Sequence, residues 1–284
     1  MPLSPVRAMR PGPPRPPEQE CAAMDHAEVA AHWEANAEHW TRQVRAGMDV
    51  YRDALNTPAF LAMLPPVAKL EGIDIGCGEG ANTRQLARLG ARMRAVDIAP
   101  TFIRHAREAE AAEPLGIAYG VGDGTALPFP DARFDFATAF MSLMDMPDQA
   151  QALREAARVL RPGGFLQFSI LHPCFAPPRR RVLRDGEGMV LGVEVSRYFD
   201  DTAGAVDEWH FSTLPVEERA GIPPFRTPRF HRTLSGWVSI ILAARLRIEA
   251  MGEPCASEEL ARQVPTVADT RVAPLFLHVR VRKG

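Results

Sequence analysis

The sequence predicts an α/β protein built on a doubly wound, mostly parallel sheet of seven strands. Between residues 70 and 171, apolar runs alternate with amphipathic segments through short connections, which is the pattern of strands and helices in such a sheet. Two later strand-like runs, "RIEAMGEP" and "VAPLFLHVRV", indicate an antiparallel hairpin that closes it. The first five strands are expected at 71–75, 92–97, 117–121, 134–140 and 164–171, and the helices between them at 81–89, 101–112 and 149–160. The "RPGG" at 161–164 is expected as a turn before the fifth strand.

The residues before the sheet divide into two segments. Residues 1–23 are rich in proline and arginine without periodicity, so we expect disorder there, and Met24 is a candidate natural start. Residues 24–69 predict helices, because Val29, Trp33, Ala37 and Trp40 recur at spacings of three and four and so share one helical face.

The main domain is expected over residues 70–284, with an insertion after the fifth strand. Residues 172–232 break the strand–helix rhythm, because prolines and glycines separate short polar and β-like pieces. We therefore interpret 172–232 as a cap on the main domain and not as a separate domain.

Composition excludes several classes of partner. The chain of 284 residues is 46% hydrophobic and 24% charged, which is typical of a soluble globular protein. A net charge of −2 gives no reason to expect nucleic acid, and no apolar run is long enough to predict a membrane span. The four cysteines lie far apart without metal-ligand spacing, so no metal is expected. We expect a cytoplasmic protein, monomeric or homodimeric.

A glycine-rich loop follows the first strand, in "GIDIGCGEG" (72–80). Gly76, Gly78 and Gly80 let the backbone approach a ligand and leave N–H groups free at the start of the next helix. Nicotinamide, flavin, nucleotide and sulfonium cofactors all use such a loop, so the glycines alone do not separate them. The spacing is GxGxG instead of GxGxxG, and Asp74 and Glu79 add negative charge that disfavours a pyrophosphate.

Two further carboxylates indicate an adenosine-bearing cofactor. Asp97 ends the second strand, where a carboxylate can accept hydrogen bonds from both hydroxyls of a ribose. Asp123 follows the third strand between Gly122 and Gly124, where it can accept a hydrogen bond from the exocyclic amine of adenine.

The motifs "DIGCGEG", "AVDIA", "GDGTALPFPDARFD" and "EAARVLRPGGFLQFSI" together resemble the Rossmann-like (class I) S-adenosylmethionine-dependent methyltransferases, in a bacterial small-molecule branch. The match covers roughly residues 70–171 in the order and spacing of that family. It implies S-adenosyl-L-methionine as cofactor and an N-terminal helical lid at 24–69. The cofactor-binding residues that it implies are Asp74, Gly76, Cys77, Gly78, Gly80, Asn82, Asp97, Ile98, Asp123, Gly124, Met141, Ser142 and, from the lid, Tyr51.

The acceptor-facing residues are less clearly marked. His172 ends the fifth strand, at the edge of the sheet where ligands bind in this fold class, and His231 precedes the helix after the cap. For each histidine, a hydrogen-bonded structural role is the alternative. We take His172, His231 and Asp145, in that order, as candidate catalytic bases. Trp40, Met144, His172 and His231 are expected to contact the substrate.

The resemblance implies methyl transfer to an O, N or C atom of a small, ring-containing molecule, with a role in specialised metabolism such as natural product biosynthesis. The cap at 172–232 would shape the acceptor pocket. Base methylation in nucleic acid is disfavoured, since the segment after the fourth strand reads "FMSLMDMP" and not Asp/Asn-Pro-Pro-aromatic. One alternative is an S-adenosylmethionine-binding enzyme with a non-transfer step such as cyclisation. A nicotinamide-dependent oxidoreductase is another, disfavoured by the GxGxG spacing, Glu79 and Asp123.

Overall fold

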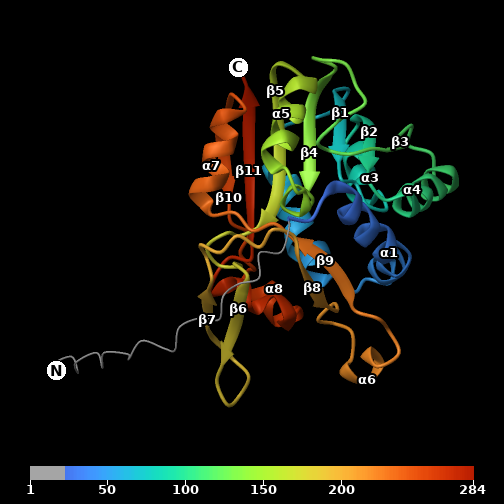
Figure 1. Ribbon diagram of the computed structural model, residues 1–284. Helices are drawn as coiled ribbons and strands as arrows, with labels where there is room; N and C mark the ends of the chain where they lie inside the picture. Colours follow the sequence, from blue (N-terminus) through green and yellow to red (C-terminus); the bar gives the residue numbers. More distant parts are fainter. Residues whose placement is uncertain (1–22) are drawn as a thin grey trace.

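Seven strands form the central sheet of the computed structural model, which describes residues 23–284 (Figure 1). Their order is β10-β11-β5-β4-β1-β2-β3, with β1 to β5 parallel and β11 antiparallel to both of its neighbours. The strands are β1 (Glu71–Ile75), β2 (Arg92–Asp97), β3 (Ala118–Val121), β4 (Phe134–Phe140), β5 (Leu160–Leu171), β10 (Leu246–Gly252) and β11 (Phe276–Lys283). The predicted fold class and the closing antiparallel hairpin are confirmed.

Helices cover both faces of this sheet, which is why its central strands are nearly continuous apolar runs. They are α3 (Ala81–Arg88), α4 (Pro100–Ala112), α5 (Gln149–Val159) and α7 (Leu234–Ala243). Local sequence sets their starts: Pro100 occupies the first turn of α4, and the Asp148 side chain caps α5 by accepting the N–H of Gln151.

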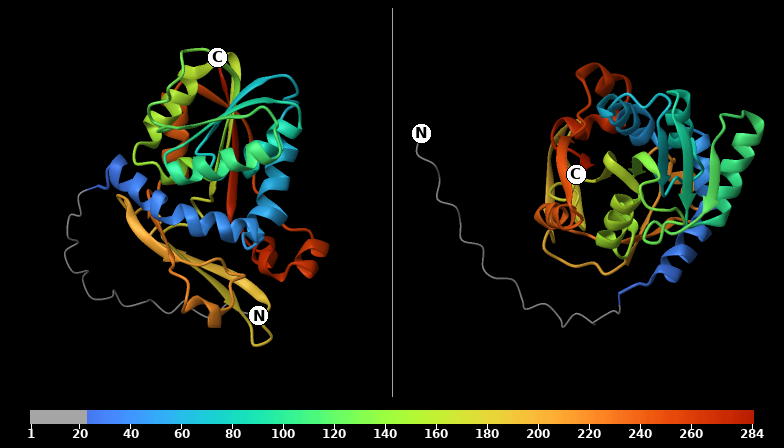
Figure 2. Two further views of the ribbon diagram at one scale, coloured as in Figure 1. Left: turned by 90° about the vertical axis from the view of Figure 1, so that its right-hand side faces the viewer. Right: turned by 90° about the horizontal axis from the view of Figure 1, so that it is seen from above.

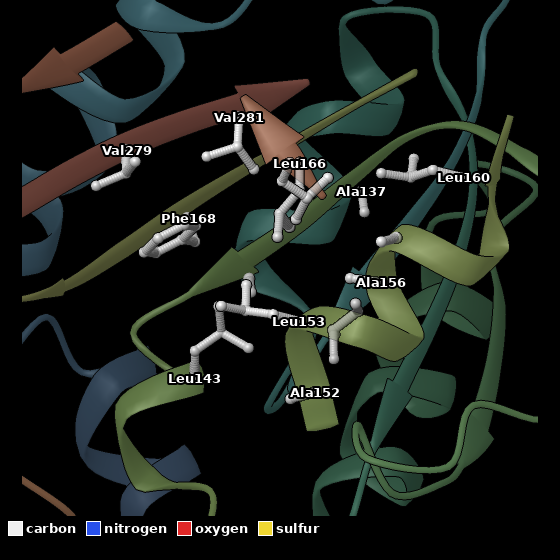
Figure 3. Close-up of a cluster of buried hydrophobic side chains, with 14 of the residues drawn as sticks. Ala137, Leu143, Ala152, Leu153, Ala156, Leu160, Leu166, Phe168, Val279 and Val281 are labelled. Atoms are coloured by element: carbon white, nitrogen blue, oxygen red, sulfur yellow. The ribbon is translucent and has the colours of Figure 1, made fainter. Parts of the chain in front are cut away.

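The larger hydrophobic core lies between the sheet and helices α5 and α7. Ala152, Leu153 and Ala156, on one side of α5, pack against side chains of β4, β5 and β11 such as Leu166 and Phe168 (Figure 3). On the other face, Phe136 and Phe165 stack with ring centroids 5.5 Å apart in a cluster that includes residues of α3 and α4. Burial on both faces holds the carboxyl ends of the parallel strands in fixed positions.

The start of β5 differs from the prediction. The strand begins at Leu160, which pairs with Phe134, and the register resumes at Phe165 opposite Phe136. "RPGG" is therefore an irregularity within the strand, with Gly163 at a φ of 77°, and not a turn that precedes it.

The remaining elements gather at the carboxyl ends of the parallel strands (Figures 1 and 2). From the N-terminal segment come α1 (His26–Arg45), the π-helical turn η1 (Arg52–Asn56) and α2 (Thr57–Met63). The cap forms two hairpins, β6 (Arg179–Arg184) with β7 (Val190–Ser196) and β8 (Ala205–Trp209) with β9 (Phe225–Arg229), and the short helix α6 (Val216–Arg219). Three short helices complete the chain: η2 (Leu143–Asp145), α8 (Glu258–Gln263) and η3 (Pro265–Arg271). Figure 2 shows α1 running between the sheet and the hairpins.

Two further sequence predictions concern the N-terminal leader and membrane-spanning helices. The expected leader lies outside the described residues except for residue 23. Among the helices that the structure describes, none is both long enough and apolar enough to cross a membrane.

Candidate functional site

A cavity of about 670 Å³ lies at the carboxyl ends of the parallel strands. Its floor is formed by the loops that follow β1, β2, β3 and β4, and its walls by α1, η1 and the β8–β9 hairpin. Ligands of open α/β sheets bind at this edge, where the strand order reverses between β1 and β4.

The three loop glycines have different physical reasons to be glycine. Gly76 and Gly80 have φ values of 74° and 89°, and a Cβ on either would lie within 3 Å of the side chain of Ser142 or Tyr119. Gly78, with a φ of 55°, has nothing within 4 Å of the place where its Cβ would be, and it lines the cavity. Gly76 and Gly80 thus shape the loop, while Gly78 leaves space for a ligand.

Asp97 is buried beside this loop and lines the cavity. One carboxylate oxygen accepts the N–H of Gly78 at 2.8 Å and the other accepts the N–H of Ala99 at 2.9 Å. Burial raises the pKa of Asp97 to about 6, although these two N–H groups lower it. The carboxylate therefore has a fixed orientation and keeps lone pairs for further donors.

Asp123 lies against the start of α1. Its Oδ1 accepts the backbone N–H of Thr125 at 2.7 Å, and its Oδ2 is 2.9 Å from His26 Nδ1. Ile98 and Gly124 line the same part of the cavity. A carboxylate, an aliphatic side chain and a glycine together provide a flat slot with a hydrogen-bond acceptor at its edge.

A charged cluster lines the other end of the cofactor loop. Arg52 of η1 donates to Glu79 Oε1 at 3.1 Å, and the second oxygen of Glu79 accepts the N–H of Ala81. Asp49 lines the cavity beside them, and burial raises its pKa to about 6 while Arg52 lowers it. Sequence reasoning singled out Tyr51 and missed Arg52, although "GMDVYRD" has a basic residue between carboxylates in the helical segment.

The far half of the cavity has aromatic and charged walls. Trp40 of α1 meets Trp209 and Phe211 of the cap edge-to-face, with ring centroids 5.5 and 5.4 Å apart. Asp207 and Arg229, on the same hairpin, form an ion pair at 2.7 Å and also line the cavity. Only Trp40 of this group was expected from the sequence, because the others come from the cap.

Most of the predicted site residues line this one cavity. They are Trp40, Tyr51, Gly76, Cys77, Gly78, Asn82, Asp97, Ile98, Asp123, Gly124, Met141, Ser142, Met144 and Asp145. The phenol of Tyr51 is already bonded, at 2.8 Å to Asp269 and at 2.7 Å to the carbonyl of Thr266.

Four predicted residues lie outside it. Asp74 is 2% exposed and accepts hydrogen bonds from the hydroxyls of Thr83 and Thr138, so it supports the loop from behind. Gly80 is packed against Tyr119 and Ala106. The expectation that Asp74 and Gly80 contact the ligand is not met by this geometry.

The two histidines are also turned away from the cavity, contrary to expectation. His172 lies at the end of β5 as predicted, but its side chain is buried, with Nε2 2.8 Å from Glu253 and Nδ1 accepting the N–H of Cys174. His231 donates from Nε2 to the carbonyl of Tyr198 and lines a separate, smaller cavity. Both histidines therefore have the alternative role, that of a hydrogen-bonded structural residue.

The fold and the site define a protein that holds an adenosine-bearing cofactor at the switch point of a doubly wound sheet. The residues fit such a group. Asp97 can accept hydrogen bonds from two hydroxyls, and Asp123 places a hydrogen-bond acceptor at the edge of the slot. Gly78 leaves open the space that a side chain would fill. Glu79 and Asp49 beside the loop do not suit a pyrophosphate.

Part of the chain matches known proteins. Residues 73–168 match a family model described as a methyltransferase domain. A 27-O-demethylrifamycin SV methyltransferase from Amycolatopsis mediterranei is 35% identical over 150 residues, which make up 50% of this chain and 55% of that protein. A malonyl-[acyl-carrier protein] O-methyltransferase from Pseudescherichia vulneris is 37% identical over 99 residues, or 35% of this chain and 38% of that one. The matches thus span 38% and 55% of the length of these two curated relatives.

The similarity to solved structures extends further along the chain. An S-adenosylmethionine-dependent methyltransferase from Mesorhizobium loti, 29% identical, superposes with a TM-score of 0.64 over 80% of this chain and 96% of its own. The methyltransferase domain at 73–168 and this similarity support a class I S-adenosylmethionine-dependent methyltransferase, with S-adenosylmethionine as cofactor.

Proposed function

We propose that the protein transfers a methyl group from S-adenosylmethionine to an O, N or C atom of a small, ring-containing molecule. The observation that carries this proposal is one continuous cavity that joins the glycine loop to a chamber walled by Trp40, Trp209 and Phe211. The loop end suits the cofactor, and the aromatic end suits a flat acceptor.

Six residues are proposed to hold the cofactor. Asp97 accepts from the ribose hydroxyls, Asp123 from the adenine amine, and Ile98 packs on the adenine ring. Gly78 makes room for the backbone approach, and Arg52 and Asp49 flank the amino-acid end. Compared with the sequence-based proposal, Arg52 and Asp49 are added, and Asp74 and Gly80 are left out because they do not line the cavity.

The bound cofactor supplies an already activated methyl group, so the protein mainly has to align the acceptor and exclude water. The N-terminal helices and the β8–β9 hairpin are proposed to do this as lid and cap, since α1 and β9 pack together over the cavity. Of the three candidate bases, Asp145 is retained, because its side chain lines the cavity while those of His172 and His231 do not.

A role in specialised metabolism is part of this proposal. The relative named 27-O-demethylrifamycin SV methyltransferase supports it, as does a chamber formed by a cap whose sequence carries little of the family pattern.

The proposal is tested by turnover against phenols, indoles and heterocyclic amines with S-adenosylmethionine. We expect S-adenosylhomocysteine and a product heavier by one methyl group to form in equal amounts, measured by mass spectrometry. Product formation without S-adenosylhomocysteine would instead support a non-transfer reaction such as cyclisation. Failure of the purified protein to bind S-adenosylhomocysteine would exclude both.

Gly78→Ala is expected to weaken S-adenosylhomocysteine binding about tenfold. Its methyl group would enter the cavity beside Asp97, where nothing in the protein now lies within 4 Å. Gly116→Ala is the matched control: Gly116 has a φ of 78° and open space around it, but it is not in the cavity lining. Both variants carry similar backbone strain of about 1 kcal/mol, measured by chemical unfolding. Equal affinity of the two variants, measured by calorimetry, would contradict the assignment of Gly78.

A further inference from the structure

The far half of the cavity has a charge pattern that restricts the chemistry of the acceptor. The cavity lining contains two arginines and seven carboxyl side chains. The carboxyl side chains are Asp49, Glu79, Asp97, Asp123, Asp145, Asp207 and Glu208. Both arginines are already paired, Arg52 with Glu79 at 3.1 Å and Arg229 with Asp207 at 2.7 Å. Among the residues that the structure describes, each arginine of the lining therefore already has a carboxylate partner. An anionic acceptor would find no unpaired arginine among these described lining residues.

Among the carboxyl groups in this half of the cavity, that of Asp145 has no hydrogen-bond partner within the described residues. Asp207 is bonded to Arg229, and Glu208 is 3.1 Å from Arg226. Within residues 23–284, no hydrogen bond joins the carboxyl of Asp145 to another residue, and this part-exposed side chain lines the cavity. The side chain of Asp145 is part-exposed to the cavity, so a ligand that supplies a donor can form a hydrogen bond with it without displacing a protein partner.

The electrostatics at Asp145 also favour a positive group. Burial raises the pKa of Asp145 well above its ordinary value; Arg229 lowers it and Asp207 raises it. Of these two charged neighbours, Arg229 has the larger effect on the pKa of Asp145, and its ion-pair partner Asp207 opposes it. A cation next to Asp145 would favour the ionised carboxylate and form a charge-assisted hydrogen bond with it.

The aromatic wall provides a second feature that suits a cation. Trp40, Trp209 and Phe211 lie edge-to-face in one group and all line the cavity. The indole N–H of Trp209 donates to Thr227 at 2.9 Å, so this side chain already has a hydrogen-bond partner on its own hairpin. Aromatic faces attract ammonium groups through their quadrupole, an effect that is largest for tryptophan.

We propose that the acceptor carries a basic amino group and binds with that group against Asp145, with its ring system beside the aromatic wall of Trp40, Trp209 and Phe211. This proposal rests on the proposed function, since it names the class of molecule that fills the acceptor chamber. Where the anchoring amino group itself receives the methyl group, Asp145 can also accept its proton; where another atom receives it, Asp145 positions the acceptor and is not the base.

Three probes with one ring system and different charges test the proposal. Tryptamine is cationic at neutral pH, tryptophol is neutral and indole-3-acetate is anionic. Each is titrated into protein saturated with S-adenosylhomocysteine, and binding is followed by ligand-observed NMR. We expect tryptamine to bind at least about tenfold more tightly than tryptophol, a difference of about 1.4 kcal/mol, and indole-3-acetate to bind most weakly.

Asp145→Asn is expected to reduce the preference for tryptamine over tryptophol to about one, because it removes the ionisable carboxyl and keeps the shape. Asp148→Asn is the matched control. Asp148 is exposed, caps α5 and is not in the cavity lining, and asparagine is an equally good N-cap. It should retain the full preference. Unchanged affinity of Asp145→Asn for S-adenosylhomocysteine shows that this variant is folded.

Three outcomes would overturn the proposal: equal or tighter binding of tryptophol or indole-3-acetate, full preference for tryptamine in Asp145→Asn, or no binding of tryptamine at millimolar concentration. Each leaves the proposed methyl transfer standing as long as S-adenosylhomocysteine binds. Loss of S-adenosylhomocysteine binding in the unmodified protein is the distinct result that contradicts the proposed function itself.

Discussion

Asp97→Asn is expected to weaken S-adenosylhomocysteine binding by about 100-fold. The carboxylate of Asp97 is fixed by the N–H groups of Gly78 and Ala99 and faces the cavity with lone pairs for two ribose hydroxyls. A hydrogen bond to a charged group contributes about 1.5–3 kcal/mol, and the amide loses both the charge and one acceptor oxygen. Two weakened bonds of this kind account for two orders of magnitude in affinity, which calorimetry measures directly.

Asp74→Asn provides the contrast to this variant. Asp74 is as buried as Asp97 and lies on the neighbouring strand, but its oxygens accept from Thr83 and Thr138 and it does not line the cavity. An asparagine can accept from one hydroxyl and donate to the other, so we expect less than a threefold change in affinity. Comparable losses in the two variants would show that Asp97 acts only through the shape of the loop.

The affinity should also depend on pH through Asp97. Its pKa of about 6 means that the carboxylate becomes protonated as the pH falls below 6, and affinity should then fall about tenfold per pH unit. Asp49 has a pKa of about 6 as well, beside the loop where the amino-acid end is proposed to bind. Titration with 5′-methylthioadenosine, which lacks the amino-acid group, isolates the contribution of Asp97. A flat pH profile for this ligand between pH 5 and 7 would contradict the assignment.

The same pKa has the opposite effect on the stability of the ligand-free protein. Because folding raises the pKa of Asp97 from its ordinary 3.8 to about 6, its stabilising contribution is fully present below about pH 4. That contribution is lost as the pH rises through 6, and a shift of this size corresponds to about 3 kcal/mol. The carboxylate that binds the ribose is therefore kept at some loss of stability, as is common at functional sites.

The sheet was predictable because its signals are local. Strands β1, β2 and β4 have the predicted bounds. Each combines buried apolar residues with a few charged ones and is bounded by loop residues. The start of β5 was not predictable in this way. A prolyl-glycine pair reads as a turn, and only pairing of Leu160 with Phe134, 26 residues away, draws "RPGG" into the strand.

The cofactor half of the site was predictable for a similar reason. Asp97 ends β2, and Gly78 and Asp123 lie in the loops just after β1 and β3. Parallel strands bring these carboxyl ends together. The acceptor half depends on contacts between distant segments. Trp209 contacts Trp40, which is 169 positions earlier in the sequence. The sequence predicted correctly that His172 ends β5, but the side chain of His172 points toward Glu253 on the loop after β10 and not into the cavity.

Arg52→Gln is expected to weaken S-adenosylhomocysteine binding about 30-fold and to leave 5′-methylthioadenosine binding within threefold of the unmodified protein. Arg52 is the arginine of the cavity lining at the cofactor loop, next to the end where the amino-acid carboxylate is proposed to bind. One charge-assisted hydrogen bond to that carboxylate accounts for about 2 kcal/mol. Because 5′-methylthioadenosine has no carboxylate, it reports whether the adenosine half of the site is still intact.

The variant should also lower the free energy of unfolding by about 3 kcal/mol, measured by chemical denaturation. The side chains of Arg52 and Glu79 are 16% and 7% exposed, and loss of the guanidinium leaves Glu79 and Asp49 without their positive neighbour. Arg104→Gln is the control, because Arg104 forms ion pairs with Glu38 and Glu108 in which all three side chains are about half exposed or more. That variant should leave both ligand affinity and stability unchanged, because solvent screens these exposed ion pairs. Equal losses for the two ligands in Arg52→Gln would mean that Arg52 only holds η1 against the loop, and the carboxylate would then have to be assigned to another donor.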